Sequence, residues 1–473
     1  MSRKCFIIFL LLFNVYQISQ QFFQSPEDSS TPDKQCFCEL KGNVDDCSCT
    51  VDTVDYYNNV KIYPRLKSLL QSNYFRFYKV NLHNECPFWK DVDFECAMKF
   101  CHVKSCEDKD LPLGFKGAAE SPHSKYIKEA QTIGCQEDYN KELDFLNKSI
   151  SEKQHQELKK WSEHDEAKDS FCVLDDDQEK AEYVDLLLNP ERYTGYQGRS
   201  AHRIWQTIYN ENCFKVQQSS NERSTYSSMM KKNVLEETCL EERVFYRMVS
   251  GLHASINIHL SANYLLPEKN SPLAAINSPN GNWGPNLNEF VKRFSPETTG
   301  PEGQKWLRNL YFAYLVELRA IAKVAPYLRT EDFYTGFEKT DKEVKLAVND
   351  LLNVIETFPS HFDESIMFNA GSKKLKEEFR EKFFNITRIM DCVGCDKCRL
   401  WGKLQTQGMG TALKILFSGK FEHNTFEISN GEHITEEKPQ FKMRRSEIVA
   451  LFNAFGRLSN SIYFLELFRN QLR

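Results

Sequence analysis

Three cysteines spaced by three residues open the stretch Cys392-Val-Gly-Cys-Asp-Lys-Cys-Arg-Leu-Trp-Gly-Lys-Leu-Gln-Thr-Gln-Gly-Met-Gly-Thr-Ala-Leu-Lys-Ile-Leu-Phe417. On a helix, side chains three residues apart lie about 60° apart on one side, so two of these thiols can bond within one turn. A Cys-x-x-Cys at a helix N-terminus favours the thiolate, which attacks disulfides and donates electrons. Asp391 is a candidate cap for this helix. The spacing therefore favours a redox-active pair.

Two other interpretations of the three cysteines stay open on spacing alone. Thiolates at this spacing also bind zinc when a fourth ligand comes from elsewhere in the chain. Cysteines in an oxidising compartment also form plain structural disulfides. We expect redox chemistry ahead of either alternative.

Length, charge and the first residues set the class of protein. The 473 residues have a balanced composition that predicts a globular protein, and a net charge of −5 excludes the broad basic surface that nucleic acid requires. Arg3 and Lys4 precede the short apolar run Cys5 to Val15, which predicts a signal peptide over residues 1–20, with a buried N-terminal helix as the alternative. No later stretch approaches 18 uninterrupted apolar residues, so we expect the mature chain to be soluble or peripheral to a membrane.

The secretory pathway permits disulfides, which changes how the 16 cysteines are interpreted. Fifteen remain if Cys5 leaves with the signal, so at least one is unpaired. Two Cys-x-Cys pairs near the N-terminus fit nested disulfides better than a zinc site because of the compartment. Two sequons, at Asn147 and Asn385, are compatible with glycosylation.

Helical periodicity dominates the second half of the chain. Apolar residues recur at three- and four-residue spacing between Leu307 and Ala322, before Pro326 ends the pattern, and again between Ile448 and Phe468. Strand alternation is scarce. We expect a mostly α fold of one domain, a polar segment over residues 107–182, and long loops over residues 217–228, 267–303 and 418–438.

Some residues outside the cysteines suit a ligand, although each is more often structural. Ser250, His253 and Asn257 share one face of a predicted helix and point polar groups toward an apolar interior. Arg192 and Thr194, with Trp205 further on, offer a guanidinium, a hydroxyl and a stacking surface. The sequence Gly408-Met-Gly-Thr-Ala-Leu413 lacks the third glycine of a dinucleotide fingerprint, so no Rossmann site is expected.

The stretch from Cys392 to Phe417 resembles the active-site segment of the endoplasmic reticulum oxidoreductin family. The resemblance extends through Tyr183-Val-Asp-Leu-Leu-Leu-Asn-Pro-Glu-Arg-Tyr-Thr-Gly-Tyr196 and Ser250-Gly-Leu-His-Ala-Ser-Ile-Asn-Ile-His-Leu260 to nearly all of the mature chain. It implies a thiol oxidase domain over residues 21–473, with flavin adenine dinucleotide (FAD) held among helices. Residues 21–110 would form a disulfide-rich region that carries a shuttle loop, and residues 180–473 the helical flavin-binding core.

The resemblance also assigns roles to the cysteines. Cys395 and Cys398 match the pair beside the flavin, and Cys96 and Cys101 match the shuttle pair that takes electrons from a partner protein. Cys106 and Cys135 match cysteines that pair with the shuttle cysteines, as Cys96–Cys135 and Cys101–Cys106, and switch them off. The implied structural bridges are Cys36–Cys49, Cys38–Cys47, Cys86–Cys392 and Cys213–Cys239, which leaves Cys172 over.

The flavin contacts implied by the resemblance come from several segments. They are Arg192, Thr194, Trp205, Ser250, His253 and Arg293. Vertebrate-like members carry a further flavin-contacting arginine where this chain has Trp306, and Arg308 is the candidate substitute.

The function implied by the resemblance is disulfide formation in the endoplasmic reticulum lumen. Protein disulfide isomerase and related thioredoxin-fold proteins would be the partners and dioxygen the acceptor, yielding hydrogen peroxide, with no metal and a monomeric chain at or near the luminal membrane face. A disulfide-rich binding protein that has lost the cofactor is the rival from another class, and a zinc module the third. The C-terminal Asn-Gln-Leu-Arg does not match a Lys-Asp-Glu-Leu-type retention signal.

Overall fold

The computed structural model confirms a mostly helical protein. It describes residues 40–44, 47–90, 101–116, 170–192, 199–212, 240–266, 283–300, 302–359, 367–368, 373–418 and 441–472. The signal peptide, Asn147, and the cysteines at positions 36, 38, 96, 135, 213 and 239 lie outside these residues, as does Thr194.

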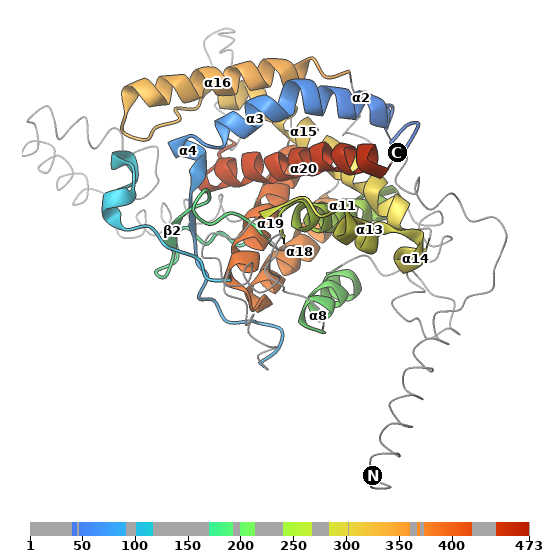
Figure 1. Cartoon of the computed structure of the whole chain (residues 1–473). Helices are drawn as coiled ribbons and strands as arrows, with labels where there is room; N and C mark the ends of the chain where they lie inside the picture. The colour runs from blue at the N-terminus through green and yellow to red at the C-terminus, as the bar shows by residue number, and fades with distance from the viewer. Residues whose placement is uncertain are drawn as a thin grey trace, which may run out of the picture.

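Four long helices form the centre of the molecule. They are α11 (Leu240–Ala262), α15 (Glu302–Thr330), α19 (Asp396–Leu416) and α20 (Arg445–Leu472). Helix α11 packs on α15 and α20, and α19 packs on α20 and α15. Helix α20 crosses the middle of the fold, with α3 and α16 on one side and α11 and α19 on the other (Figure 1). It is long and apolar enough to cross a membrane, but 83% of its apolar window is buried, as expected for a core helix.

Two positions let neighbouring helices approach closely because they lack a side chain. A Cβ atom at Gly251 on α11 would clash with the backbone oxygen of Asn309 on α15. A Cβ atom at Gly408 on α19 would clash with the Cβ atom of Ala454 on α20. Both glycines therefore set the spacing of the central helices.

Helix α15 continues past the proline that the sequence predicts as its end. Pro326 lies inside the helix, which runs on to Thr330. A proline removes one helical hydrogen bond and crowds the preceding turn. Val324, Ala325 and Leu328 are fully buried around it, so tertiary packing holds the helix together across the break.

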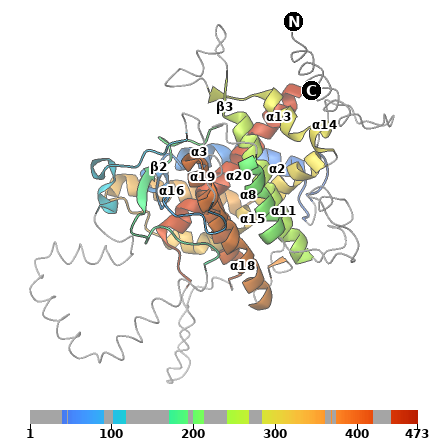
Figure 2. The same ribbon diagram turned by 90° about the horizontal axis from the view of Figure 1, so that it is seen from below.

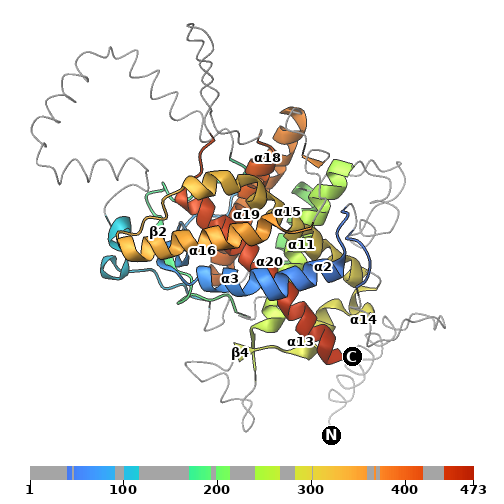
Figure 3. The same cartoon turned by 90° about the horizontal axis from the view of Figure 1, so that it is seen from above.

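Shorter helices cover this centre. On the N-terminal side, α2 (Val51–Tyr56), the π-helical turn η1 (Tyr57–Ile62) and α3 (Tyr63–Leu69) run along α20, and α16 (Glu338–Glu356) packs on α15 and α3 (Figure 3). The remaining helical segments are α4 (Asn73–Arg76), α8 (Arg199–Thr207), η4 (Ile208–Asn212), α13 (Leu287–Phe294), α14 (Pro296–Thr299), α18 (Lys373–Ile389), and the 3-10 turns η2 (Asp108–Asp110), η3 (Leu113–Phe115) and η5 (Met390–Cys392).

Part of the loop predicted over residues 267–303 is helical instead. Helix α13 buries Phe290 and Phe294, and Asn286 caps it by accepting a hydrogen bond from the backbone N–H of Glu289 at 3.1 Å. The abundance of proline, glycine and asparagine around it hid this short apolar period. The helix matters because it carries Arg293.

Two small antiparallel sheets tie distant segments together. Strand β1 (Phe77–Val80) pairs with β2 (Glu182–Asp185), with Phe77 opposite Asp185 and Val80 opposite Glu182. Strand β3 (Tyr264–Leu265) pairs with β4 (Trp283–Gly284). Ser105 forms an isolated bridge with Val184, so the segment over residues 101–116 is attached to β2.

Candidate functional site

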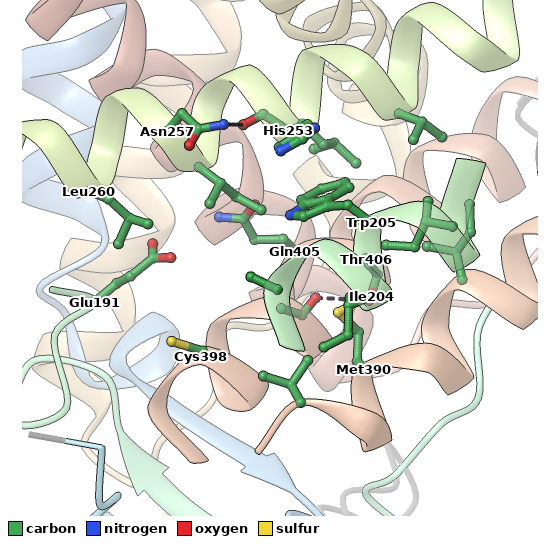
Figure 4. A pocket seen from close by; sticks show the side chains of 18 of the residues that line it. Glu191, Ile204, Trp205, His253, Asn257, Leu260, Met390, Cys398, Gln405 and Thr406 are labelled. Carbon is green, nitrogen blue, oxygen red and sulfur yellow. Dashed lines mark hydrogen bonds between the residues drawn. The ribbon is translucent and has the colours of Figure 1, made fainter. Parts of the chain in front are cut away.

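A cavity of about 450 Å³ opens between the central helices and the peripheral helix α8. Its walls come from α8, α11, α13, α18 and α19, together with Glu191 and with Arg457 of α20. Helix α8 lies over α11 in Figure 2. The volume lies within the range of about 300–1,000 Å³ typical of cofactor sites. Figure 4 shows Cys398, Trp205, His253 and Gln405 around it.

The start of α19 places two of the three cysteines differently from the prediction of one continuous helix. Cys392 lies in η5, Cys395 is the N-cap of α19, and only Cys398 lies within the helix, in its first turn. Asp391 is not the cap: its carboxylate lies 2.6 Å from Lys403 Nζ. Cys398 is therefore near the positive end of the helix dipole, which favours a thiolate.

The disulfide of Cys395 joins two segments that lie far apart in the sequence. Cys395 is bonded to Cys101, rather than to Cys398 as predicted, and Cys101 is bonded neither to Cys96 nor to Cys106. The backbone N–H of Lys397 donates a hydrogen bond to the carbonyl oxygen of Cys101 at 2.8 Å. This contact holds the Cys101 segment against the start of α19, where its sulfur reaches Cys395, and a sulfur forms one such bond at a time.

The disulfide Cys86–Cys392, which the resemblance implied, is present in the structure with a Cα–Cα distance of 4.4 Å. This disulfide links the end of the described segment over residues 47–90 to η5, which directly precedes Cys395 and α19. With Cys392 and Cys395 both in disulfides, two of the three thiolates that a zinc site would need are not available here.

The remaining described cysteines are scattered. Cys106 and Cys49 carry thiols, and burial raises the pKa of each to about 11. The Cys49 sulfur is buried and donates to the Thr50 carbonyl oxygen at 3.6 Å, and its predicted partner Cys36 lies outside the described residues. Cys172 is also a buried thiol, with its sulfur 3.5 Å from the Thr406 carbonyl oxygen. Cys47 lies beside Cys49, and its predicted partner Cys38 lies outside the described residues.

One face of α19 forms the floor of the cavity. Cys398, Gly402, Gln405 and Thr406 all line it, as the helical period of 3.6 residues dictates. A Cβ atom at Gly402 would lie 2.7 Å from the sulfur of Met390, so glycine keeps this wall open. The buried side-chain nitrogen of Gln405 has no hydrogen-bond partner among the described residues and is an available donor.

An aromatic wall faces this floor. The ring of Trp205 on α8 stacks on His253 of α11, with centroids 3.5 Å apart and planes inclined by 11°. The hydroxyl of Tyr209 lies 3.3 Å from His253 Nδ1. Burial, helped by the nearby charge of Arg293, lowers the pKa of His253 to about 3, so the imidazole is neutral at neutral pH.

The other predicted cofactor contacts divide between the cavity and its surroundings. Arg293 lines the cavity, and its guanidinium donates to Asn257 Oδ1 at 2.7 Å. Ser250 is outside the lining and accepts a hydrogen bond from Asn309 Nδ2 at 3.0 Å. Three helical residues amount to about 300°, so Ser250 is turned about 60° away from His253 and faces α15. Arg192 lies with its guanidinium 5.0 Å above the ring of Trp283.

Arg308, which the sequence suggests as a replacement for the flavin-contacting arginine of other family members, does not reach the cavity. Arg308 is half-buried and donates hydrogen bonds to the carbonyl oxygens of Lys41 and Asn43 at 3.1–3.4 Å. It therefore contacts the N-terminal segment instead of the cavity. Trp306 packs behind His253, with ring centroids 6.5 Å apart.

Glu191, His259 and Arg457 form a buried polar cluster that sequence reasoning missed. The guanidinium of Arg457 donates to a carboxylate oxygen of Glu191. His259 Nε2 lies 3.4 Å from the other oxygen. Arg457 is the only charged residue between Glu447 and Glu466 of α20, which is the signal that points to this cluster.

The residues around the cavity fit a flavin. A planar ring system needs an apolar slot, which Trp205 and His253 border, and hydrogen-bond donors at its polar edge, which the unpartnered Gln405 nitrogen can supply. Arg293 and Arg457 bring positive charge to the same walls, as a cofactor with phosphate groups or a reduced, anionic ring requires. Cys398 lines the same cavity, so a thiol stands beside the slot.

The sequon at Asn385 lies inside α18 and not in an exposed loop. Asn385 is half-buried, and the Thr387 hydroxyl is buried and donates to the Phe384 carbonyl oxygen at 2.7 Å. The folded chain therefore presents this sequon poorly.

Comparisons with known proteins give one consistent result. A family model described as Endoplasmic Reticulum Oxidoreductin 1 (ERO1) matches residues 61–465. The Ero1-like protein of Drosophila melanogaster is 56% identical over 100% of this chain and 98% of its own length. The human ERO1-like protein alpha is 46% identical over 100% of this chain and 99% of its own. A solved structure of a cysteine mutant of S. cerevisiae Ero1p is 30% identical, with a TM-score of 0.55, and covers 89% of this chain and 97% of that one.

Proposed function

Because this chain belongs to the endoplasmic reticulum oxidoreductin 1 family, we propose that it is a flavin-dependent thiol oxidase that makes disulfide bonds for other proteins. A solved relative, Ero1p, is described as the source of disulfide bonds for oxidative protein folding in the cell. Protein disulfide isomerase and similar thioredoxin-fold proteins would supply the electrons. The family name and the predicted signal peptide support the endoplasmic reticulum lumen as its compartment.

The observation that carries this proposal is the line of sulfur atoms that ends at the cavity. Cys101 is bonded to Cys395 at the start of α19, and Cys398 lies one turn further along and lines the cavity. The Cys101 segment is held to β2 by the Ser105 bridge and by the hydrogen bond from the Cys106 N–H to the Tyr183 carbonyl oxygen at 2.8 Å. Electrons that enter at Cys101 can reach the cavity through sulfur atoms alone.

The relay follows from this order of sulfur atoms. A thiolate of Cys398 attacks the Cys395 sulfur, the Cys395–Cys398 bond forms, and Cys101 leaves as a thiolate. In the direction that passes electrons to the inner pair, the Cys101 thiolate attacks Cys395 and Cys398 leaves as a thiolate. The Cys96 thiolate then attacks Cys101, the shuttle disulfide forms, and Cys395 leaves as a thiolate. The Cys101–Cys395 disulfide is thus the mixed disulfide of an exchange between the shuttle cysteines and the inner pair.

The cofactor's neighbours would hold and orient it. Trp205 and His253 would border the ring, Gln405 would donate to its polar edge, and Arg293 would add positive charge. Bound flavin would accept two electrons from the inner cysteines and pass them to dioxygen, giving hydrogen peroxide. The protein's part is to position Cys398 and to exclude other thiols from this slot.

We also propose that Cys106 and Cys135 regulate the shuttle. In this arrangement Cys101–Cys106 and Cys96–Cys135 hold the shuttle cysteines apart, so they cannot accept electrons. Cys101 and Cys106 are close in sequence and lie on one described segment. Removing both regulatory cysteines by alanine substitution should shorten the lag before oxidation starts, and an unchanged lag would refute the regulation.

Oxygen consumption by the purified protein tests the proposed function. With a reduced thioredoxin-fold protein as donor, the wild type should consume oxygen and form peroxide, whereas Cys395→Ala and Cys398→Ala should lose more than 99% of this rate. Cys172→Ala is the matched control, because Cys172 is a buried thiol that does not line the cavity. Near-normal turnover of either active-site variant would refute the assignment.

A further inference from the structure

The carboxyl group of Glu191 is buried against the cavity that Cys398 lines. Its side chain is 9% exposed, and it lies on the cavity wall together with Cys398 (Figure 4). One carboxylate oxygen accepts from Arg457. The other, Oε2, has no hydrogen-bond partner among the described residues. A buried oxygen without a partner costs free energy, so its retention at this wall needs a reason.

Arg457 connects this carboxyl group to the thiol. Arg457 is 4% exposed, and its charge interacts with both Glu191 and Cys398. Two of its nitrogens, Nε and Nη1, have no hydrogen-bond partner among the residues that the structure describes. Arg457 therefore stabilises a negative charge on both Glu191 and Cys398. A negative charge on one of these two groups weakens the stabilisation that Arg457 gives to the other.

Burial brings the pKa of the Glu191 carboxyl close to neutral pH. Burial raises the pKa of its carboxyl to about 7, against the opposing effect of Arg457. His259, on the other side, has its pKa lowered to about 3 by burial and by Arg457, so it stays neutral and does not compete for the proton. A group that titrates near the working pH is suited to moving protons.

The other titratable groups on the cavity walls are less suited to this role. His253 has a pKa of about 3, and Glu289 is engaged with Arg293 at 3.1 Å. Lys397, which is outside the lining, interacts with the Cys398 charge from the first turn of α19 and, as a cation, cannot accept a proton. The remaining titratable groups on the lining are His202 on α8, which is exposed, and Lys292 on α13.

We propose that Glu191 is the proton acceptor for the Cys398 thiol during oxidation of the inner cysteine pair, a role that rests on the proposed thiol oxidase function. The Cys398 S–H bond breaks, its proton moves to a Glu191 carboxylate oxygen, and the thiolate remains paired with Arg457. Two thiols lose two electrons and two protons when their disulfide forms, and dioxygen takes up two of each as it becomes hydrogen peroxide. The proton that Glu191 holds, from Cys398, and the proton released by Cys395 are the two taken up as oxygen is reduced, so the cycle balances.

Three variants test this proposal. Glu191→Gln keeps the size of the side chain and an oxygen for Arg457 but cannot accept the proton. Glu191→Asp keeps the carboxyl group. Glu317→Gln is the matched control, because Glu317 is a fully buried carboxyl on α15 that does not line the cavity and whose pKa is also raised by burial.

Turnover with a reduced thioredoxin-fold donor is measured from pH 5.5 to 9. Wild type should show a rise in turnover centred near pH 7. Glu191→Gln should lose this rise and be at least about 100-fold slower, the low end of what general acid–base groups contribute. Glu191→Asp should recover at least tenfold over Gln, and Glu317→Gln should match wild type. Turnover of Glu191→Gln within threefold of wild type, or no recovery by Asp, overturns the proposal.

A second measurement requires neither oxygen nor cofactor. The rate of Cys398 alkylation by iodoacetamide in the reduced protein is followed against pH by peptide mass spectrometry, with a protease other than trypsin because Lys397 and Arg399 flank the cysteine. In Glu191→Gln the alkylation midpoint should move to lower pH, because Arg457 no longer shares its charge with a carboxylate. An unmoved midpoint contradicts the coupling. Inactive wild type with a shifted midpoint would instead refute the thiol oxidase function alone.

Discussion

Lys403 pairs with two carboxylates beside the Cys392–Cys395 turn. Its replacement should lower the free energy of unfolding by an amount that can be estimated. Its ammonium group lies 2.8 Å from the Asp175 carboxylate and 2.6 Å from that of Asp391, the residue before Cys392. The Lys403 and Asp175 side chains are each 8% exposed, and that of Asp391 is 12% exposed. Lys403→Met leaves two buried carboxylates without a cation. Removing one partner of a buried pair costs about 3–5 kcal/mol.

The loss should depend on pH. Burial raises the pKa of Asp175 while Lys403 lowers it, so without Lys403 this carboxyl holds its proton to higher pH. Asp175 neutralises as the pH falls, so the destabilisation by Lys403→Met should be full near pH 8 and shrink toward pH 5.

Urea unfolding of the oxidised protein measures the effect. Lys342→Met is the control, since Lys342 pairs with Glu338 at 2.6 Å on an exposed surface, where solvent screens the pair and its loss should change stability little. Adding Asp175→Asn and Asp391→Asn to Lys403→Met should recover part of the loss. A loss below 1 kcal/mol for Lys403→Met, or one that is the same at pH 5 and pH 8, would refute this reasoning.

Two further predictions concern the helix that carries His253. The pKa of His253 is about 3 in the folded protein and 6.5 when unperturbed. The stability of the fold is therefore unaffected by this group above pH 6.5. Stability falls as the pH drops from 6.5 toward 3, by about 5 kcal/mol in total. His253→Gln should therefore reduce the acid sensitivity of urea unfolding between pH 7 and pH 4, and equal sensitivity in both proteins would contradict the assignment. Gly251→Ala should destabilise by about 1–3 kcal/mol or more because its Cβ atom meets the Asn309 carbonyl of α15, and a thermal midpoint within 1 °C of wild type would show that α11 and α15 can separate freely.

The main helices could be predicted because their apolar periods are long and uninterrupted. The patterns over residues 307–322 and 448–468 correspond to α15 and α20. The end of α15 was placed too early because proline disfavours a helix locally, whereas buried neighbours on both sides of Pro326 hold it. Helix α13 was missed because eight residues inside a loop-like composition give a weak period.

Features of the site that lie within one stretch of sequence could be predicted. Contacts between stretches that are distant in the sequence could not. The spacing of Cys395 and Cys398 marked the start of α19, but the bond from Cys395 to Cys101 joins residues 294 positions apart, which no local pattern contains. Ser250 lies about 60° from His253 on α11 and bonds with Asn309 of α15, and a helical period alone does not tell which of two such neighbours reaches the cavity. Glu191 and Arg457 were overlooked for the same reason as the disulfide, since their pairing exists only in the folded chain.

The central claim is that electrons from a dithiol protein reach a flavin through Cys398. The most direct test is the bleaching of the yellow absorbance of oxidised flavin after anaerobic mixing of the purified protein with a reduced thioredoxin-fold donor. Wild type should be yellow and bleach on mixing, and Cys398→Ser should stay yellow under the same conditions. A colourless wild type, or equal bleaching of the Cys398→Ser variant, would contradict the account.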